Sequence, residues 1–162
     1  MFIQRQSSHK VNRMATTVNS KKKRLDSFEL MSIAIPNMGT KYPLDVAMGA
    51  ILTEFAQPNS EGVQIGNTLF SVLVGKNRQG VFKAFNADTA ANFVENSKEF
   101  TKWAYDNLGL DVLVVDYESK EVDKLIRLIA RGKPKNQGVS FFKMKSGRDR
   151  AVIRLGTPRS AS

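Results

Sequence analysis

The fold is decided by residues 86–132, which read NADTAANFVENSKEFTKWAYDNLGLDVLVVDYESKEVDKLIRLIARG. The stretch predicts a helix, a strand and a second helix in direct succession. Small and apolar side chains recur there at spacings of three and four, which places them on one face of a helix over residues 87–108. They are Ala90, Phe93, Ser97, Phe100, Ala104 and Leu108. We expect Asn86 or Asp88 to cap the start of this helix and Gly109 to end it.

The predicted strand follows directly, over residues 110–117. Its centre is continuously apolar and β-branched, which is typical of a strand covered on both faces. Ser119 is expected to cap the second helix, and Gly132 with Pro134 to end it. The apolar stripe of that helix consists of Val122, Leu125, Ile126 and Ile129.

The flanking segments add further strands and one helix. Residues 28–35 are predicted to form a strand that ends at Pro36, and residues 43–57 a helix. Gly49 inside that helix either permits close packing or is a tolerated defect. Further strands are predicted at residues 63–65, 69–74, 81–85, 139–144 and 150–155. Of these, the second and third form one antiparallel hairpin, and the last two another.

The element order predicts one α/β (α+β) domain over residues 27–156. It has a mixed central sheet with helices on both faces, a basic flexible tail at residues 1–26 and a short polar tail at residues 157–162. The chain has no cysteine, which excludes disulfides and thiolate chemistry. No apolar run is long enough to cross a bilayer, and no signal-peptide core follows the basic N-terminus. We therefore expect a protein that is not secreted.

The net charge of +10 is unevenly distributed along the chain. Residues 1–25 carry seven basic side chains and no acid, and residues 127–162 carry ten basic side chains and a single acid, Asp149. The part between them is net acidic. Such segregation favours either a phosphate polymer or an acidic protein surface as a partner, whereas the simpler alternative is a basic face that only aids solubility.

Two groups of basic residues are candidates for nucleic-acid binding through phosphate contacts. They are Lys21, Lys22, Lys23 and Arg24 in the tail, and Lys143, Lys145, Arg148, Arg150 and Arg154 in the terminal hairpin. Each phosphate that such a side chain neutralises releases counterions and adds salt-dependent affinity. No zinc finger or aromatic RNA-binding signature is present, so sequence-specific recognition is not expected.

The sequence offers little for other chemistry. His9 is the only histidine and lies in the tail, so no His/Cys metal cluster and no Ser/His nucleophile pair can be assembled. Asp111, Asp116 and Glu118 flank the central strand, where acids are usually solvated or capping. We therefore predict no catalytic residue, no metal and no cofactor.

The element order resembles the GCN5-related N-acetyltransferase (GNAT) fold over residues 28–155. The segment 112–142 is similar to that family's strand, crossover helix and following strand. Where the family often reads Asn-x-x-Ala-x-x-Leu-Tyr-x-x-x-Gly-Phe, this chain has Ser119-Lys-Glu-Val122-Asp-Lys-Leu125-Ile126, and Gly138-Val139 follow later. The resemblance implies acetyl-CoA as cofactor and an amine as acceptor.

Two departures from the family pattern imply a degenerate site. The family holds the pyrophosphate of acetyl-CoA on a glycine-rich loop at a helix start, but residues 85–90 here read FNADTA, without glycine and with Asp88 setting a negative charge against the anion. The family's tyrosine acid would fall near Ile126 or Arg127, and neither can supply a proton at neutral pH. Tyr117 ends the predicted strand close to these positions, and we expect it to be a core or rim residue.

These observations leave three interpretations of function. The first is a non-enzymatic, basic structural or accessory protein of a viral or nucleoprotein assembly, which binds nucleic acid or an acidic partner. Some tailed-phage internal virion proteins resemble degenerate GNAT members, and genome packaging or delivery in the virion or host cytoplasm would suit a basic tail. The alternative is a divergent acetyl-CoA-dependent N-acyltransferase, with backbone amides near Ala87 to Ala90 holding the cofactor. The third is an interaction subunit whose basic pole docks an acidic protein.

Overall fold

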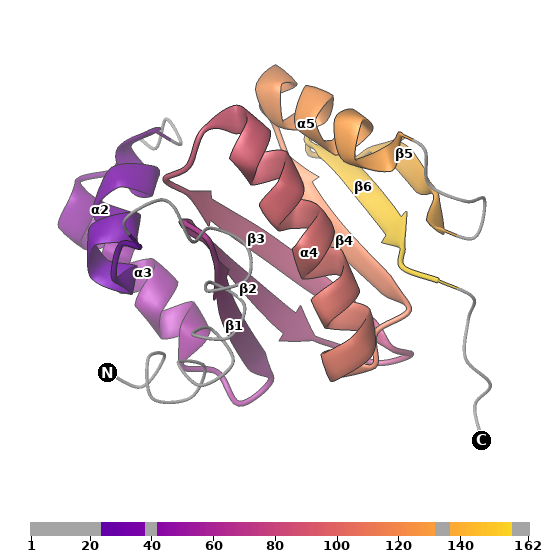
Figure 1. Cartoon of the computed structure of the whole chain (residues 1–162), viewed down its shortest axis with the longest axis horizontal. Coiled ribbons are helices and arrows are strands. Elements are labelled where there is room, and N and C mark those ends of the chain that lie inside the picture. The colour runs from indigo at the N-terminus through magenta and orange to yellow at the C-terminus, as the bar shows by residue number, and fades with distance from the viewer. Residues whose placement is uncertain (1–23, 38–41, 132–136, 157–162) are drawn as a thin grey trace.

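The computed structural model describes residues 24–37, 42–131 and 137–156, which form a six-stranded mixed sheet with four helices (Figure 1). The helices are α2 (Ser27–Asn37), α3 (Leu44–Phe55), α4 (Ala90–Leu108) and α5 (Lys120–Ala130). The strands are β1 (Ser60–Ile65), β2 (Thr68–Val74), β3 (Gln79–Asn86), β4 (Val112–Tyr117), β5 (Val139–Lys143) and β6 (Asp149–Arg154). Their order in the sheet is β1-β2-β3-β4-β6-β5. Only β3 and β4 are parallel, and all other neighbours are antiparallel.

Helices cover both faces of the sheet, as the sequence predicts. On one face α4 packs its apolar stripe on the strands, and the ring of Phe100 stacks on that of Phe70 at 4.2 Å between centroids. α5 lies beside α4 on the same face (Figure 1). On the other face α2 and α3 lie over the β1–β3 half, where Leu30 and Ile35 of α2 are buried with Phe85 of β3. The predicted fold class is therefore confirmed.

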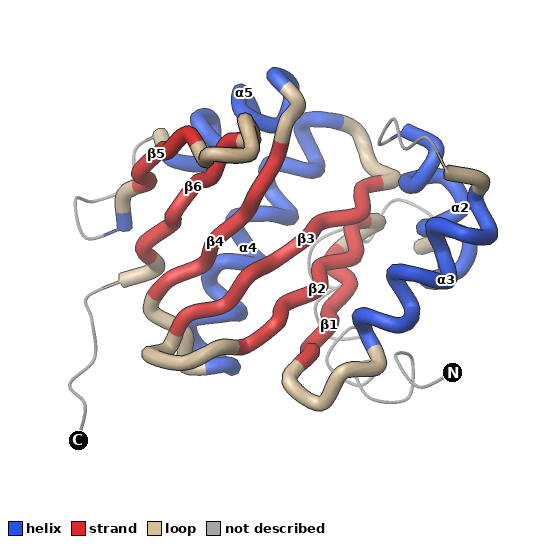
Figure 2. Tube along the Cα trace, turned by 180° about the vertical axis from the view of Figure 1, so that it is seen from behind, coloured by secondary structure: helices blue, strands red, loops and turns tan. Residues whose placement is uncertain are grey.

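The central strand β4 differs from its prediction in one respect. α4 and α5 cover one of its faces, where Leu113 and Tyr117 are buried. On the opposite face Val112 and Val114 are only half-buried, and Figure 2 shows β4, β6 and β5 from this side with no described helix over them. The prediction that β4 is covered on both faces is thus wrong within the described part of the chain.

The segment predicted as a first strand, residues 28–35, is instead the helix α2. Its buried side chains recur with helical spacing, and they are Leu30, Met31, Ala34 and Ile35. Asp26 caps the helix, because its Oδ1 accepts from the backbone nitrogen of Glu29 at 2.8 Å. The pattern Asp26-x-x-Glu29 is a capping signature, but the β-branched Ile33 and Ile35 favour a strand. Pro36 lies in the last turn of α2.

The three caps of the central unit are only partly as predicted. Thr89, rather than Asn86 or Asp88, caps α4, since its hydroxyl accepts from the backbone nitrogen of Asn92 at 3.2 Å. Gly109 closes α4 with φ +67°, as predicted. Ser119 also acts as predicted, because its Oγ accepts from the backbone nitrogen of Val122 at the start of α5.

Some predictions lie outside the described residues. They are the stop at Gly132 and Pro134 and almost all of the two tails. Both predicted hairpins, β2–β3 and β5–β6, are confirmed. None of the helices in the described ranges has the length and apolar character of a membrane span.

Candidate active site

The two parallel strands pair over only part of their length. The ladder joins Gln79, Gly80 and Val81 of β3 to Val112, Leu113 and Val114 of β4. Beyond these residues β3 continues to Asn86 and β4 to Tyr117, and Figure 2 shows the two strands diverging. We call residues 82–86 of β3 and 115–117 of β4 the strand split. Ligands of open α/β sheets bind at the carboxyl ends of parallel strands, so this is the candidate site.

In the split, backbone polar groups of β4 that point toward β3 lie beyond the end of the ladder. The Val112 nitrogen donates to the Arg78 carbonyl on the β3 side. Because main-chain groups alternate in direction along a strand, the Asp116 carbonyl points to the same side, beyond the end of the ladder. There it accepts a hydrogen bond of 3.3 Å from Nη2 of Arg148, which comes from the turn between β5 and β6.

The facing edge of β3 also extends beyond the end of the ladder. The Gly75 nitrogen bonds the Gln79 carbonyl across the hairpin, so odd-numbered residues of β3 face β2 and even-numbered residues face β4. The backbone N–H and C=O of Ala84 therefore point into the split. Buried or half-buried main-chain groups need partners, and an extended ligand with amide groups would supply them.

The start of α4 lies directly after the carboxyl end of β3. An α-helix leaves the amides of its first turn without intrahelical partners, and it carries a partial positive charge there. Thr89 takes the Asn92 amide. Ala90 and Ala91 are the first two residues of α4. Both are exposed, and their small side chains leave their backbone amides accessible. This helix start suits an anion such as a phosphate.

Asp88 does not lie free at this helix start. Its Oδ2 accepts from the Asn67 backbone nitrogen at 2.8 Å and from Nδ2 of Asn96 at 2.9 Å. Asn86 adds two bonds to the backbone of Asp88, with its Oδ1 accepting from the nitrogen and its Nδ2 donating to the carbonyl. The predicted negative charge is thus engaged in fixing the β3–α4 loop to the β1–β2 turn. The loop, which contains no glycine, is thus fixed by side-chain hydrogen bonds.

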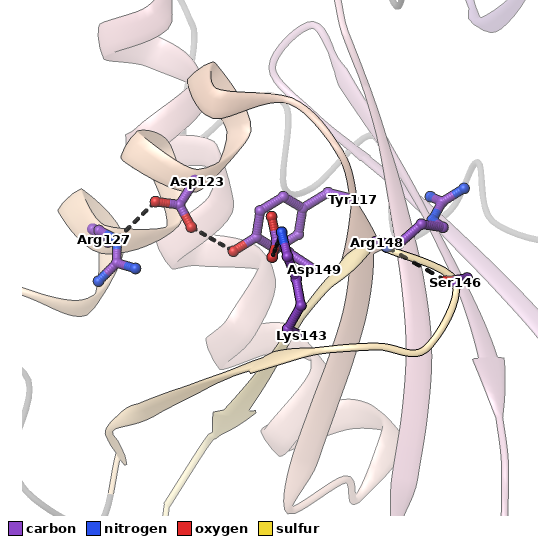
Figure 3. Close-up of polar contacts among 7 residues, drawn as sticks. All are labelled: Tyr117, Asp123, Arg127, Lys143, Ser146, Arg148 and Asp149. Carbon is purple, nitrogen blue, oxygen red and sulfur yellow. Dashed lines mark hydrogen bonds and ion pairs between the residues drawn. The ribbon is translucent and has the colours of Figure 1, made fainter.

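A second polar chain fixes α5 to the end of β4 (Figure 3). The Tyr117 hydroxyl donates to Oδ1 of Asp123 at 2.6 Å, and Oδ2 of Asp123 accepts from Nε of Arg127 at 2.7 Å. The Arg127 guanidinium lies 4.0 Å from the ring centroid of Phe141. Burial, and then the bond to Asp123, raise the pKa of Tyr117 well above its usual range. The bonds from Arg127, and then from Tyr117, lower the pKa of Asp123.

Among the described residues, neither position at which the family's tyrosine acid would fall carries a tyrosine. Tyr117 is buried, as predicted for a core or rim residue, and its proton is used in the bond to Asp123. At the positions where the family places its tyrosine, Ile126 is buried in the core and Arg127 is paired with Asp123. The described residues also contain no group of three or more side chains that could hold a metal ion.

The predicted basic groups are not brought together. Arg24 precedes α2 beside the β1–β2 turn, whereas the β5–β6 hairpin forms the opposite edge of the sheet. Lys21, Lys22 and Lys23 lie outside the described residues. Within the hairpin, Lys143 pairs with Asp149 at 3.1 Å, and Arg154 donates to Oγ of Ser140. Lys145 is exposed.

The Arg150 guanidinium is also occupied, because it binds both carboxylate oxygens of Asp116, at 2.7 and 3.0 Å. This pairing lowers the pKa of Asp116 and raises that of Arg150. Two of the five basic side chains of the hairpin, Lys143 and Arg150, are therefore paired with acids. Nothing in its geometry tests the predicted nucleic-acid contacts.

Comparison with known proteins finds relatives by fold alone. No protein-family model and no curated protein sequence matches the chain. A mutant of the spermidine N-acetyltransferase SpeG of Vibrio cholerae is 10% identical with a TM-score of 0.51, over 82% of this chain and 94% of that one. The N-acetyltransferase PseH of Campylobacter jejuni in complex with acetyl coenzyme A is 11% identical with a TM-score of 0.51, over 80% and 92%. An acetyltransferase of Agrobacterium tumefaciens is 12% identical with a TM-score of 0.53, over 80% and 87%.

These neighbours correct the first interpretation of the sequence. A non-enzymatic structural protein of a viral or nucleoprotein assembly is contradicted, because the matching structures are acetyltransferases and one of them holds acetyl coenzyme A. The comparisons instead favour the alternative interpretation, a divergent acyltransferase. The mixed sheet, the strand split and the neighbours agree that this chain has the fold of the GCN5-related N-acetyltransferases.

Proposed function

We propose that this protein is an N-acyltransferase that uses acetyl-CoA. The observation that carries the proposal is the strand split, whose exposed backbone edge leads directly to the start of α4. The strand split offers backbone groups that can bond the amides of an extended ligand, and the anion site at the start of α4 lies next to them. Acetyl-CoA has the complementary order of groups, a thioester, an amide-containing arm and a pyrophosphate.

Named residues fit each part of that cofactor. The amides of Ala90 and Ala91 would hold the pyrophosphate, favoured by the positive end of α4. The backbone of Ala84 would bond an amide of the arm. The Asp88 carboxylate keeps its charge, but the bonds from Asn67 and Asn96 hold it against the β1–β2 turn and the second turn of α4. When bound, acetyl-CoA supplies an acyl group on a thioester, from which an amine nitrogen displaces the sulfur.

The chain contributes placement rather than a strong acid. Tyr117 is committed to Asp123, and Arg127 is part of the same chain of bonds. As the C–N bond forms and the C–S bond breaks, the proton that the amine loses would therefore pass to solvent, and the departing thiolate of CoA would take its proton from solvent rather than from a tyrosine. Holding an amine against a thioester in the right orientation is a large source of rate in itself.

Calorimetric titration with acetyl-CoA tests the proposal, with ADP as the polyanion control. We expect micromolar binding of acetyl-CoA and clearly weaker binding of ADP, because ADP lacks the arm that the strand split would hold. Equal, weak binding of both compounds would contradict the proposal. Release of free thiol on adding amines to the complex then tests transfer itself.

A further inference from the structure

Arg148 occupies an unusual position in the strand split. It belongs to the β5–β6 turn, yet its Nη2 reaches the Asp116 carbonyl on the side of β4 that faces β3. Figure 3 shows its side chain pointing away from Asp123 and Arg127. A guanidinium has five N–H donors, and this contact uses one of them. The remaining donors lie at the carboxyl end of β4, beside the strand split.

The Arg148 guanidinium is not held by a carboxylate. Its contact with Asp116 is to the main-chain carbonyl, and both carboxylate oxygens of Asp116 are bonded to Arg150. Among the described residues Arg148 forms no ion pair, because its bond to Asp116 is to the main chain.

The other basic side chains on this face of the sheet are engaged or exposed. Lys83 of β3 is paired with Glu54, and Arg154 bonds a serine hydroxyl. Lys145 is exposed on the same turn as Arg148. Arg148 therefore brings a positive charge with spare donors to the end of β4, which repels a polyamine and attracts an anion.

Resting on the proposed function, we infer that Arg148 binds a carboxylate or phosphate group of the acceptor, so that the substrate is an amine that also carries an anion. The planar guanidinium fork matches both groups with paired hydrogen bonds. One end of such a substrate would be fixed at Arg148. Its amine would then reach the acyl group from a defined side.

Matched pairs of amines test the inference. The rate of thiol release from acetyl-CoA is measured with two pairs of amines and with spermidine. The first pair is the α-amides of glutamate and glutamine, which differ in one carboxylate. The second pair is glucosamine 6-phosphate and glucosamine, which differ in the phosphate. We expect the more anionic member of at least one pair to react about tenfold faster, and spermidine to react slowly. The pair that shows the difference identifies a carboxylate or a phosphate as the bound group.

Two variants connect the preference to Arg148. Arg148→Gln should reduce the difference within the pair to about twofold or less, while Arg148→Lys should retain part of it. Lys145→Gln is the matched control, because it removes the same charge from the same turn at an exposed position. A preference that survives in Arg148→Gln, or is lost equally in Lys145→Gln, overturns the inference. Melting temperatures of all variants check that the fold is intact.

Calorimetry separates failure of the inference from failure of the proposed function. If acetyl-CoA binds but no anionic amine is preferred, the inference is wrong and the proposed function stands. If acetyl-CoA does not bind, the proposed function fails. The anionic amines are then titrated into the protein alone. Binding that Arg148→Gln abolishes still supports an anion site, and no binding to the wild-type protein overturns it.

Discussion

The Tyr117 hydroxyl donates a 2.6 Å hydrogen bond to the Asp123 carboxylate, which connects the last residue of β4 to the first half of α5. The bond is short, as expected for a charged acceptor. Because Tyr117 is buried, few other partners could replace Asp123. The contact therefore sets the position of α5 relative to the carboxyl end of β4.

Tyr117→Phe should lower the free energy of unfolding by about 1 kcal/mol, because it removes one hydrogen bond and leaves the ring in the core. Urea titration measures the change. A double-mutant cycle with Asp123→Asn checks the cause, since the two changes together should cost less than the sum of the separate costs. Acetyl-CoA binding and thiol release should be nearly unchanged. A large loss of activity with normal stability would show instead that the hydroxyl takes part in transfer.

Asp116 should make the stability of the protein sensitive to acid. The hydrogen bonds from Arg150 lower its pKa in the folded state below the ordinary value of 3.8. A carboxyl whose pKa is lowered on folding stabilises the protein fully above the unfolded pKa, and the contribution is lost as the pH falls through the folded pKa. Melting temperatures recorded from about pH 6 to about pH 2.5 should thus fall more steeply in the wild type than in Asp116→Asn. Arg150→Gln should flatten the same curve, and two parallel curves would show that the pairing contributes nothing.

The central unit could be predicted because its signals are local. The stripe of α4, the left-handed Gly109 and the cap at Ser119 are all decided by neighbours within a few residues. The prediction of a strand at residues 28–35 was wrong. Ile33 and Ile35 have strand propensity, but the burial of α2 against Phe85 decides the outcome. That contact is distant in sequence, so propensity alone could not show it.

The candidate site was only partly predicted from the sequence, for a related reason: the alternative interpretation named the amides near Ala87 to Ala90 but not the strand split. The strand split depends on where the β3–β4 ladder stops, and no single residue type marks that point. The missing glycines before α4 suggested a lost cofactor site, but long-range bonds from Asn67 and Asn96 hold Asp88 and the loop. The pairing of Arg148 with the Asp116 carbonyl likewise joins residues 32 apart in the sequence.

Two glycine-to-alanine changes should have opposite effects on stability. A Cβ at Gly80 would lie 2.7 Å from Cγ1 of Val72 and 2.9 Å from Cδ1 of Leu110. Gly80→Ala should therefore cost about 1–3 kcal/mol by overpacking next to the β3–β4 ladder. A Cβ at Gly49 has no atom within 4 Å, which identifies this glycine as a tolerated defect in α3. Gly49→Ala should gain about 0.5–1 kcal/mol, and equal effects in urea titrations would contradict this account.

The start of α4 allows a test in which folding and cofactor binding move in opposite directions. Ala91→Glu places a carboxylate in the exposed first turn of α4, where the helix dipole favours a negative charge, so stability should be unchanged or slightly raised. The same charge opposes a pyrophosphate at these amides, and acetyl-CoA affinity should fall by about tenfold or more. Ala50→Glu, at an exposed position on α3, is the matched control and should bind acetyl-CoA as the wild type does. Calorimetric titration of the wild type and both variants with acetyl-CoA measures these affinities. An unchanged affinity of Ala91→Glu would show that the first turn of α4 is not part of the cofactor site.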